Sequence, residues 1–285
     1  MAFETGDPPG QSGRREITGF SNPTVKFLRS LRDKKHRKRE GKFLAEGLRL
    51  LTDARISGRI PELLVMAAQR DPHPLLAQLE EAVLSCGGQI IDTTADILTK
   101  ITGKDNAQTV VGMFAEFDTS LGSLDRSRGD IWMAAQALRD PGNLGTMLRT
   151  CDAVGAGGLI LIDDCADPFS VEAVRASMGA VFTQQIAMAG WDEFSGWLRS
   201  EPGQLPGQLP GQLVAASLRD AVDYRGAPYS APCFILIGNE SRGLPAEYED
   251  ACDLRVTMPM KGRADSLNAA VAGAVLAYEV LASFD

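Results

Sequence analysis

Two short apolar runs near the carboxyl end of the chain constrain its fold more than any other feature. Residues 234–237 (FILI) break at Gly238, and residues 254–258 (LRVTM) break at Pro259. Runs of this length bounded by turn residues are typical of buried strands in a parallel sheet. A helix rich in Ala and Val is predicted to follow from Ser266, a residue type that caps helices well. Ligands of open parallel sheets bind beyond the carboxyl ends of the strands, so both polar breaks are predicted to lie at a functional edge.

The residues at these breaks resemble two motifs of the SpoU/TrmH ribose methyltransferases, which are RNA 2′-O-methyltransferases of the SPOUT class. One motif reads GNESRGLP from Gly238, and the other reads MPMKGRADSLNAAVA from Met258. The family's first motif, an Asn, a Gly and an Arg after a strand, is expected earlier in the chain. The segment LRDPGNLGTMLRT supplies Asn143, Gly145 and Arg149. Three motifs in this order are more specific than any one alone, and the resemblance covers residues 131–285.

The resemblance and the strand and helix pattern together indicate an α/β protein with two domains. In residues 131–285 the resemblance implies a SPOUT-type parallel sheet with helices on both faces and a C-terminal trefoil knot. Strands alternate with helices in residues 20–118, which predicts a small α/β domain; it resembles the family's RNA substrate-binding domain. Residues 1–19 are expected to be a flexible tail, and the Gly- and Ser-rich residues 119–130 a linker. Three PGQL copies at residues 202–213 predict an expanded surface loop.

Within the larger domain, residues 131–138 and 181–186 are predicted to be strands because both are short apolar runs. Asn143 follows the first of these strands and is predicted to cap a helix that runs to Val154. A helix N-terminus also presents free N–H groups, which suits an anionic ligand. Capping and a role in the site are compatible at this position.

The resemblance implies a catalytic set of Arg149, Asn143, Glu240, Ser266 and Asn268. Transfer of a methyl group to a ribose 2′-oxygen requires alignment of the reacting atoms and stabilisation of a developing alkoxide. Arginine hardly deprotonates, so Arg149 is expected to activate the hydroxyl electrostatically, and a phosphate or water is left to take the proton. Glu240 is expected to hold Arg149 or a loop in place. Asn143 and either Ser266 or Asn268 are expected to orient the ribose and the arginine.

The cofactor implied by the resemblance is S-adenosylmethionine, bound mainly through backbone groups of the second and third motifs. A glycine at position 238 allows a ligand to approach the backbone closely. No metal is expected, because two histidines and five scattered cysteines provide no sensible ligand set. The implied cofactor-binding residues are Leu236, Gly238, Asn239, Met258, Pro259, Met260, Ser266 and Leu267.

Basic residues gather in one segment, although the formal net charge of the whole chain is −8. Nine of the 29 Lys and Arg residues lie between Lys26 and Lys42. Such a run is usually a solvated helix end, but its place in the expected substrate domain favours contact with RNA phosphates. The predicted RNA-binding residues are Lys34, Lys35, Arg37, Lys38 and Arg39.

Several classes of protein are disfavoured by the sequence. No apolar run has the length of a membrane span, and the N-terminus has no apolar region of the secretory type, so a cytoplasmic location is expected. The segment GAGG at residues 155–158 lacks the third glycine of the dinucleotide fingerprint and follows a helix. A nucleotide-dependent α/β enzyme unrelated to RNA is therefore disfavoured.

The function favoured by these features is RNA 2′-O-ribose methylation, with ribosomal RNA preferred over transfer RNA. Two alternatives stay open: a tRNA ribose methyltransferase, and a non-catalytic RNA-binding factor of ribosome assembly with the same fold. The resemblance also implies a homodimer through the methyltransferase domain. The final Ala- and Val-rich helix fits a dimer interface, and it fits a helix buried within one chain equally well.

Overall fold

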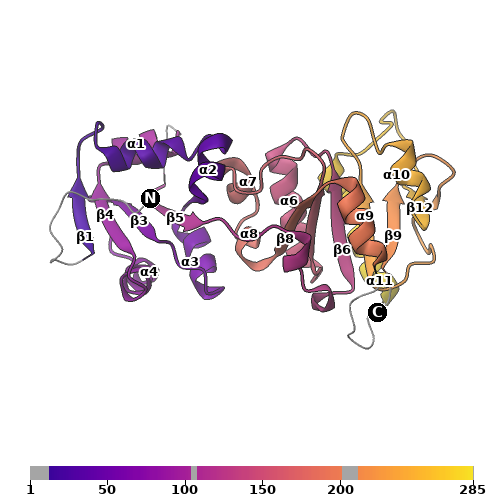
Figure 1. Cartoon of the computed structure of the whole chain (residues 1–285), viewed down its shortest axis with the longest axis horizontal. Helices are drawn as coiled ribbons and strands as arrows, with labels where there is room; N and C mark the ends of the chain where they lie inside the picture. Colours follow the sequence, from indigo (N-terminus) through magenta and orange to yellow (C-terminus); the bar gives the residue numbers. More distant parts are fainter. Residues whose placement is uncertain (1–12, 104–107, 201–210, 285) are drawn as a thin grey trace. The chain divides into compact units, whose positions relative to one another are not determined.

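The computed structural model describes residues 13–103, 108–200 and 211–284 of the 285-residue chain. The chain divides into two compact units, Met1–Glu116 and Phe117–Asp285. This division lies close to the domain boundary expected at residue 118. Each unit contains a β-sheet with its own helices (Figure 1).

The first unit is built on a five-stranded mixed sheet in the order β1-β4-β3-β5-β2. Strands β1, β4 and β3 are parallel, whereas β5 is antiparallel to both β3 and β2. Its elements are β1 (Arg14–Ile17), α1 (Pro23–Ser30), α2 (Lys34–Glu40), β2 (Lys42–Glu46), α3 (Leu48–Ile56), β3 (Leu63–Ala67), α4 (Pro74–Ser85), β4 (Gln89–Thr93), α5 (Ala95–Thr102) and β5 (Val110–Ala115).

Strand β1 corrects the expected flexible tail at residues 1–19. Residues Arg14–Ile17 pair in parallel with β4, and Thr93 Oγ1 donates a hydrogen bond to the backbone oxygen of Ile17 at 2.6 Å. The side chain of Ile17 is buried. The polar composition of this segment hid a strand that is stabilised by long-range ion pairs and not by an apolar run. Residues 1–12 lie outside the described part of the chain.

The second unit is built on a seven-stranded sheet in the order β10-β12-β9-β11-β6-β7-β8. All of its strand pairs are parallel. Its elements are η1 (Leu121–Ser123), η2 (Arg126–Arg128), β6 (Ile131–Gln136), α6 (Pro141–Ala153), β7 (Gly158–Ile162), α7 (Val171–Ala176), α8 (Ala180–Thr183), β8 (Gln185–Ala189), α9 (Trp191–Arg199), β9 (Gln212–Ala216), β10 (Val222–Asp223), β11 (Cys233–Ile237), α10 (Ala246–Asp250), β12 (Leu254–Thr257) and α11 (Ala269–Phe284).

Helices cover both faces of this parallel sheet, which confirms the predicted α/β architecture. On one face Trp132 of β6 belongs to a buried cluster with Phe194 and Leu198 of α9. On the other face α11 lies so close that a Cβ atom at Gly273 would be 2.6 Å from Cε of Met133. Adjacent residues of β6 therefore point to opposite helical layers, as expected of a strand buried on both sides.

The order in which the chain adds strands to the sheet reverses between β6 and β11. From β6 the chain proceeds to β7 and β8 on one side, and it returns on the other side through β9, β11 and β12. Strands β11 and β6 are neighbours in register, with Ile237 opposite Ala135. The crevice beyond the carboxyl ends of two such strands is where open α/β sheets bind ligands. The loops after β6 and β11 meet at this point.

Two further expectations about the second unit were wrong. The segment 119–130, expected to be a linker, contains η1 and η2, and Leu121 is buried in the core of the second unit. The segment 181–186, expected to be a strand, contains the end of α8 before β8 starts at Gln185. A short apolar run does not distinguish a buried strand from a buried helical turn. Residues 202–210 of the PGQL repeat lie outside the described residues, whereas Gln212 and Leu213 belong to β9 and not to the expected surface loop.

Candidate active site

Helix α6 begins with an aspartate cap, which leaves Asn143 free for other contacts. Asp140 Oδ1 accepts a hydrogen bond from the backbone N–H of Asn143 at 2.7 Å, and Pro141 occupies the first turn. The prediction that Asn143 caps the helix was therefore wrong. With the cap supplied by Asp140, the amide of Asn143 points to side chains from two other segments.

Asn143, Glu240 and Asn268 form a hydrogen-bonded cluster, called here the amide cluster. Asn143 Nδ2 donates to Glu240 Oε1 at 3.0 Å, and Asn268 Nδ2 donates to Asn143 Oδ1 at 2.9 Å. The three residues come from α6, from the loop after β11 and from the residue before α11. Each predicted motif thus contributes one polar side chain to a single cluster at the carboxyl edge of the sheet.

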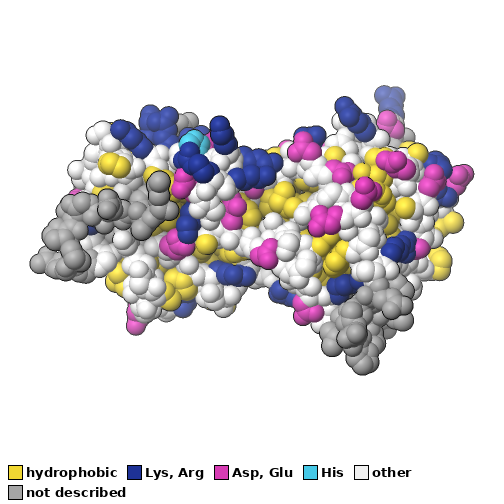
Figure 2. Space-filling model, viewed as in Figure 1, with side chains coloured by type: hydrophobic (Ala, Val, Ile, Leu, Met, Phe, Trp, Pro, Cys, Tyr) yellow, Lys and Arg dark blue, Asp and Glu magenta, His cyan; other side chains and the backbone are white. Residues whose placement is uncertain are grey.

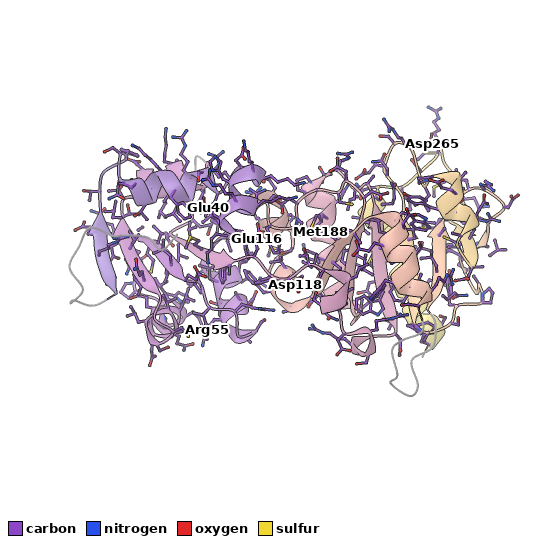
Figure 3. All side chains as sticks on the ribbon, viewed as in Figure 1. Glu40, Arg55, Glu116, Asp118, Met188 and Asp265 are labelled. Atoms are coloured by element: carbon purple, nitrogen blue, oxygen red, sulfur yellow. The ribbon has the colours of Figure 1, made fainter. Side chains whose placement is uncertain are left out.

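Asn268, and not Ser266, caps the last helix. The Oδ1 atom of Asn268 accepts hydrogen bonds from the backbone N–H groups of Ala270 and Val271, at 3.0 and 3.2 Å. Ser266 is exposed, and its hydroxyl donates to Asp265 Oδ1 at 3.2 Å. Figure 3 labels Asp265 on this loop before α11. The structure therefore brings Asn268 into the amide cluster and does not bring Ser266 there.

The loop after β11 folds back on its own first residues. Asn239 forms a backbone bridge with Gly243, and its Oδ1 accepts from the N–H groups of Ser241 and Arg242 at 3.0 and 3.2 Å. The other end of the same amide donates to the backbone oxygen of Ala137 at 2.9 Å. A Cβ atom at Gly238 would lie 2.5 Å from the carbonyl carbon of Gly243. Glycine is required at position 238 because the returning loop occupies that space.

The loop from Met258 to Leu267 presents free backbone groups. Within the described residues, no hydrogen bond joins a backbone N–H or C=O of this loop to the rest of the protein. Pro259 and Ser266 are exposed, and Leu267 is 39% exposed. A ligand with many donors and acceptors, such as S-adenosylmethionine, fits a loop with unpaired backbone groups.

The side chain of Leu236 does not reach the site, so only its backbone groups remain a predicted contact of the cofactor. Its side chain is fully buried in the core cluster on the α9 face, and its strand pairs with β6 on one side and β9 on the other. The remaining predicted positions lie at the end of β11 or in the loop after β12.

Arg149 lies on the exposed side of α6. Neither a hydrogen bond nor an ion pair joins its guanidinium to any other residue in the described ranges, so the structure does not bring it into contact with the amide cluster. The helix that carries it is closely packed, because a Cβ atom at Gly145 would lie 2.5 Å from Cβ of Ala176 on α7. The backbone beneath Arg149 is thus fixed, while its guanidinium is available to a substrate.

Ser217, which follows β9 directly, was not among the predicted site residues. Strand β9 lies between β11 and β12, so its carboxyl end shares the edge with both motif loops. Ser217 Oγ donates to Glu249 Oε1 at 2.6 Å and accepts from the N–H of Arg219 at 2.9 Å. The polar break at this position was a visible signal. The strand order brings Ser217 to the same edge as the motif loops, and a single sequence does not show the strand order.

The basic segment of the first unit contains one arginine with a structural role. Arg37 is 2% exposed and donates to the backbone oxygens of Leu31 and Arg32, at 2.9 and 2.7 Å. The prediction that Arg37 contacts RNA was therefore wrong, because burial removes its side chain from the surface. Lys34, Lys35, Lys38 and Arg39 are exposed. Lys and Arg side chains gather over α1 and α2 on the face drawn in Figure 2.

Between α1 and α2 a shallow cavity of about 380 Å³ is lined by Arg29, Ser30, Arg32, Asp33 and His36. No described carboxylate forms an ion pair with Arg29 or Arg32. Arg39 lies 3.1 Å from His36 Nδ1, and an arginine only donates, so that ring nitrogen is the acceptor. The neutral ring of His36 then carries its proton on Nε2. We call this set of Arg29, Arg32 and His36 the basic cavity.

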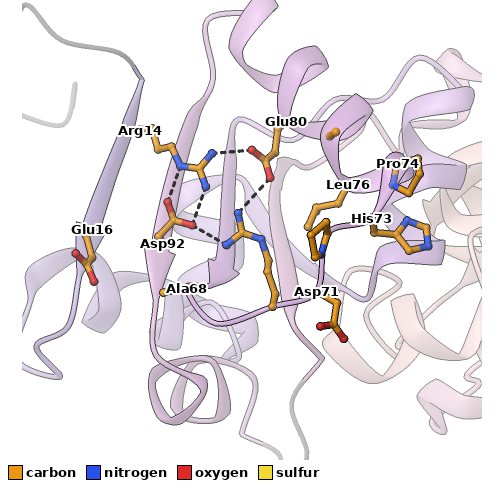
Figure 4. Close-up of a pocket in the computed structure, with 12 residues that line it drawn as sticks. Arg14, Glu16, Ala68, Asp71, His73, Pro74, Leu76, Glu80 and Asp92 are labelled. Atoms are coloured by element: carbon orange, nitrogen blue, oxygen red, sulfur yellow. Dashed lines mark hydrogen bonds and ion pairs between the residues drawn. The ribbon is translucent and has the colours of Figure 1, made fainter.

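A second, larger cavity in the first unit is lined by paired charges. It measures about 910 Å³ and lies beside α4 and β4 (Figure 4). Arg14 bonds to Asp92 at 2.6 Å and to Glu80 at 2.7 Å, and Arg70 bonds to the same two carboxylates at 2.8 and 3.2 Å. These four charges neutralise one another and join β1, β4 and α4.

No group of three or more His, Cys, Asp or Glu within the described residues is arranged to hold a metal ion. The same part of the chain has no helix that is both long and apolar enough to cross a membrane.

Comparison with known proteins places both units in one type of enzyme. Residues 130–278 match the SpoU rRNA Methylase family, and residues 22–112 match the MRM3-like substrate binding domain. The 23S rRNA (guanosine(2553)-2′-O)-methyltransferase RlmP of Bacillus subtilis is 28% identical over 267 residues, which cover 93% of this chain and 99% of that protein. The 23S rRNA (uridine(2479)-2′-O)-methyltransferase of Streptomyces viridochromogenes is 29% identical over 271 residues, which cover 94% and 92%.

A solved structure resembles the whole fold. The AdoMet-bound rRNA methyltransferase from Sinorhizobium meliloti has a TM-score of 0.86 and 37% sequence identity, over 96% of this chain and 100% of that one. The similarity extends through both units. The chain therefore belongs to the SpoU rRNA Methylase family.

Proposed function

We propose that this protein is an S-adenosylmethionine-dependent RNA 2′-O-ribose methyltransferase that acts on ribosomal RNA. The observation that carries the proposal is the amide cluster, in which Asn143, Glu240 and Asn268 are hydrogen-bonded at the carboxyl edge of a parallel sheet. Chain segments far apart in sequence supply these residues, and Arg149 lies on the same helix as Asn143. Relatives that match nearly the whole chain are named 23S rRNA 2′-O-methyltransferases, which favours ribosomal RNA over transfer RNA.

The cofactor site consists of the end of β11 and the loop after β12. Gly238 and Asn239 come from the first element, and the free backbone groups from Met258 to Leu267 come from the second. Ser217 extends the site at the end of β9. When bound, S-adenosylmethionine supplies an electrophilic methyl group. The chain's own residues bind and orient it, and Gly238 allows the loop after β11 to return close to the end of the strand.

Arg149 stabilises the ribose oxygen as negative charge develops on it. A guanidinium keeps its proton, so it lowers the energy of the alkoxide without acting as a general base. The amide cluster holds the loops that surround the 2′-hydroxyl in a fixed orientation, and Glu240 acts through its bond to Asn143. A phosphate or water takes the proton.

The basic surface of the first unit contacts the RNA backbone. Its exposed members are Lys34, Lys35, Lys38 and Arg39, to which the structure adds the basic cavity of Arg29, Arg32 and His36. Two guanidinium groups that form no ion pair with a described residue suit a phosphate group, as does a ring N–H, although Asp33 lies at the same cavity. Asp33 already accepts a hydrogen bond from the N–H of Lys35 at 2.8 Å, which reduces its repulsion of an anion.

The second unit forms a homodimer with a knotted C-terminal segment. Val271 is 48% exposed and Tyr278 is 54% exposed, seven residues apart on one side of α11. This apolar stripe supports a contact with a second copy. The trefoil knot rests on the family resemblance. Light scattering that finds only a monomer at micromolar concentration would remove the dimer from this proposal.

The experiment that tests the function compares ligands and RNA classes. S-adenosylhomocysteine is expected to raise the melting temperature, because a ligand of the native state stabilises it, whereas NAD is expected to have no effect. Labelled methyl is expected to enter unmodified ribosomal RNA and not transfer RNA. Binding of S-adenosylhomocysteine without labelling of either RNA would indicate a ribosomal particle as the substrate. Absence of both would support a non-catalytic assembly factor.

A further inference from the structure

Helix α10 is too short to fix its own position. It has five residues, Ala246–Asp250, and its N-terminus has no side-chain cap. An isolated helix of one or two turns is unstable in water, so its place must come from tertiary contacts. It follows the loop Asn239–Leu244 through Pro245, and this loop belongs to the proposed cofactor site. Whatever holds α10 therefore also holds one end of the loop.

Tyr248 is the main apolar anchor of α10. Its side chain is buried, its ring stacks on Trp191 with centroids 3.8 Å apart, and its hydroxyl donates to Asp163 Oδ2 at 3.0 Å. Burial, together with the hydrogen bond to Asp163, raises the pKa of Tyr248 to about 12. The hydroxyl thus keeps its proton and remains a donor at physiological pH.

Asp163 is held in a strained conformation by contacts from three directions. Its φ angle is +62°, in the left-handed region that costs energy for a residue other than glycine. Besides Tyr248, its carboxylate accepts from Gln136 Nε2 at 3.0 Å and from the backbone N–H of Trp191 at 3.2 Å. Such strain persists only where the surroundings determine the conformation, and it often marks a functional region.

Hydrogen bonds fix the loop Asn239–Leu244 at both of its ends. Gln136 ends β6, and the next residue, Ala137, has a φ of +49° and accepts the hydrogen bond from Asn239 Nδ2. One end of the loop is thus fixed to Ala137, and the other end is fixed through Tyr248 to Asp163. Gln136 joins these two anchors, and both strained residues lie at the carboxyl ends of adjacent strands.

We propose that the chain Gln136–Asp163–Tyr248 positions the loop Asn239–Leu244 and thereby sets the affinity for S-adenosylmethionine. These are positioning residues, which act on the cofactor through the loop and through α10. The proposal rests on the proposed function, because it assigns the loop to the cofactor site. It adds a set of residues outside the three motifs.

The experiment replaces the donor hydroxyl in the full chain. Tyr248→Phe keeps the ring stacked on Trp191 and removes the hydrogen bond to Asp163. The dissociation constant of S-adenosylhomocysteine, measured by calorimetry without RNA, is expected to rise by about five- to tenfold, as for loss of a bond to a charged acceptor. The KM for S-adenosylmethionine is expected to rise in parallel, with kcat and the KM for RNA within about twofold of the wild type.

A matched control is Tyr229→Phe, which removes a tyrosine hydrogen bond in the same unit. The Tyr229 hydroxyl donates to the backbone oxygen of Tyr224 at 2.6 Å, and neither residue bonds to Gln136, Asp163 or Tyr248. This variant is expected to lose stability while binding S-adenosylhomocysteine as the wild type does. Equal binding by Tyr248→Phe and the wild type would overturn the proposal, and so would equal weakening in both variants.

If Tyr248→Phe does not fold, Gln136→Met provides the same test. It keeps the length of the side chain and removes the donor to Asp163, and unchanged affinity would again overturn the proposal. A wild-type protein that binds no S-adenosylhomocysteine would refute the proposed function itself. A wild type that binds and methylates, with variants of equal affinity, would refute the positioning role alone.

Discussion

Two arginines of the first unit and one arginine of the second unit stand in opposite surroundings. Arg14 and Arg70 each bond to both Glu80 and Asp92, and they join β1 to the rest of the first sheet. Arg149 projects from α6 of the second unit, and the described residues offer it no ion-pair partner. The charge of a guanidinium in an ion pair is neutralised, and the pair stabilises the fold. A guanidinium without such a partner, on a rigid helix, can interact with a negatively charged substrate.

The basic segment of the first unit also contains both kinds of arginine, those bonded within the protein and those open to solvent. Arg37 is buried and bonded to backbone oxygens, whereas Arg29 and Arg32 lie at an open cavity. These arginines are near one another in sequence, and their composition gives no hint of the difference. Surroundings, and not residue type, decide which of them can contact RNA.

Arg149→Ala is expected to have the largest effect. Loss of an electrostatic stabiliser of the developing alkoxide typically lowers kcat by about 100- to 1000-fold. The melting temperature should change little, because the side chain makes no described polar contact. Single-turnover methylation and thermal unfolding measure the two quantities. Arg175→Ala, at an exposed position on α7, is the matched control and should remain active. Normal methylation by Arg149→Ala would remove it from the catalytic role.

Arg37→Ala is expected to destabilise the protein by about 2–3 kcal/mol. The variant loses charge-assisted hydrogen bonds to two carbonyls and leaves these acceptors buried. Lys38→Ala, at an exposed position on the same helix, should cost less than about 0.5 kcal/mol. Urea unfolding of the full chain gives both values. An Arg37→Ala protein of normal stability and weakened RNA binding would restore the original RNA-contact prediction.

Replacing Arg29, Arg32 and His36 together by Ala is expected to weaken RNA binding by about tenfold. The logarithmic dependence of affinity on salt should become shallower by about one to two, since each lost phosphate contact removes counterion release. S-adenosylhomocysteine binding should be unchanged. Filter binding at several salt concentrations measures the slope. An unaltered slope would show that RNA follows another surface.

The smallest expected effect is the pH dependence of the stability that Arg14 and Arg70 provide through their ion pairs with Asp92. Burial alone would raise the pKa of Asp92, but hydrogen bonds from Arg14 and Arg70 outweigh it and lower that pKa below its usual value. The stabilisation is therefore present above the ordinary pKa of aspartate, near 4, and is lost as the pH falls through the lower folded value. Between pH 7 and pH 2.5 the wild type should lose about 1 kcal/mol more of its unfolding free energy than Asp92→Asn. Equal losses would mean that the ion pairs contribute nothing.

The fold was predictable where apolar patterns and motifs were strong. The strands predicted at residues 234–237 and 254–258 and the parallel sheet followed from short apolar runs with polar breaks, and the second strand ends one residue earlier, at Thr257. Strand β1 was not predictable, because its stability comes from ion pairs with residues far along the chain. The helical turn α8 was mistaken for a strand, since burial on all sides produces the same apolar run in either form.

The candidate site was predictable as a set of residues but not as a set of contacts. Asn143, Glu240 and Asn268 were named from motifs, whereas their hydrogen bonds depend on strand order and loop geometry. The N-terminal capping residues of α6 and α11 illustrate this difference. Asp140 and Asn268 were both eligible by residue type, but only the structure shows that they, and not Asn143 and Ser266, cap α6 and α11.

The central claim concerns the atom that receives the methyl group. Unmodified ribosomal RNA is incubated with S-adenosylmethionine and the full chain, digested to nucleosides and analysed by mass spectrometry. We expect one 2′-O-methylnucleoside with an unmodified base, and its absence when Arg149→Ala replaces the wild type. A methyl group on a base, or equal product with Arg149→Ala, would contradict transfer to a ribose oxygen with the help of Arg149.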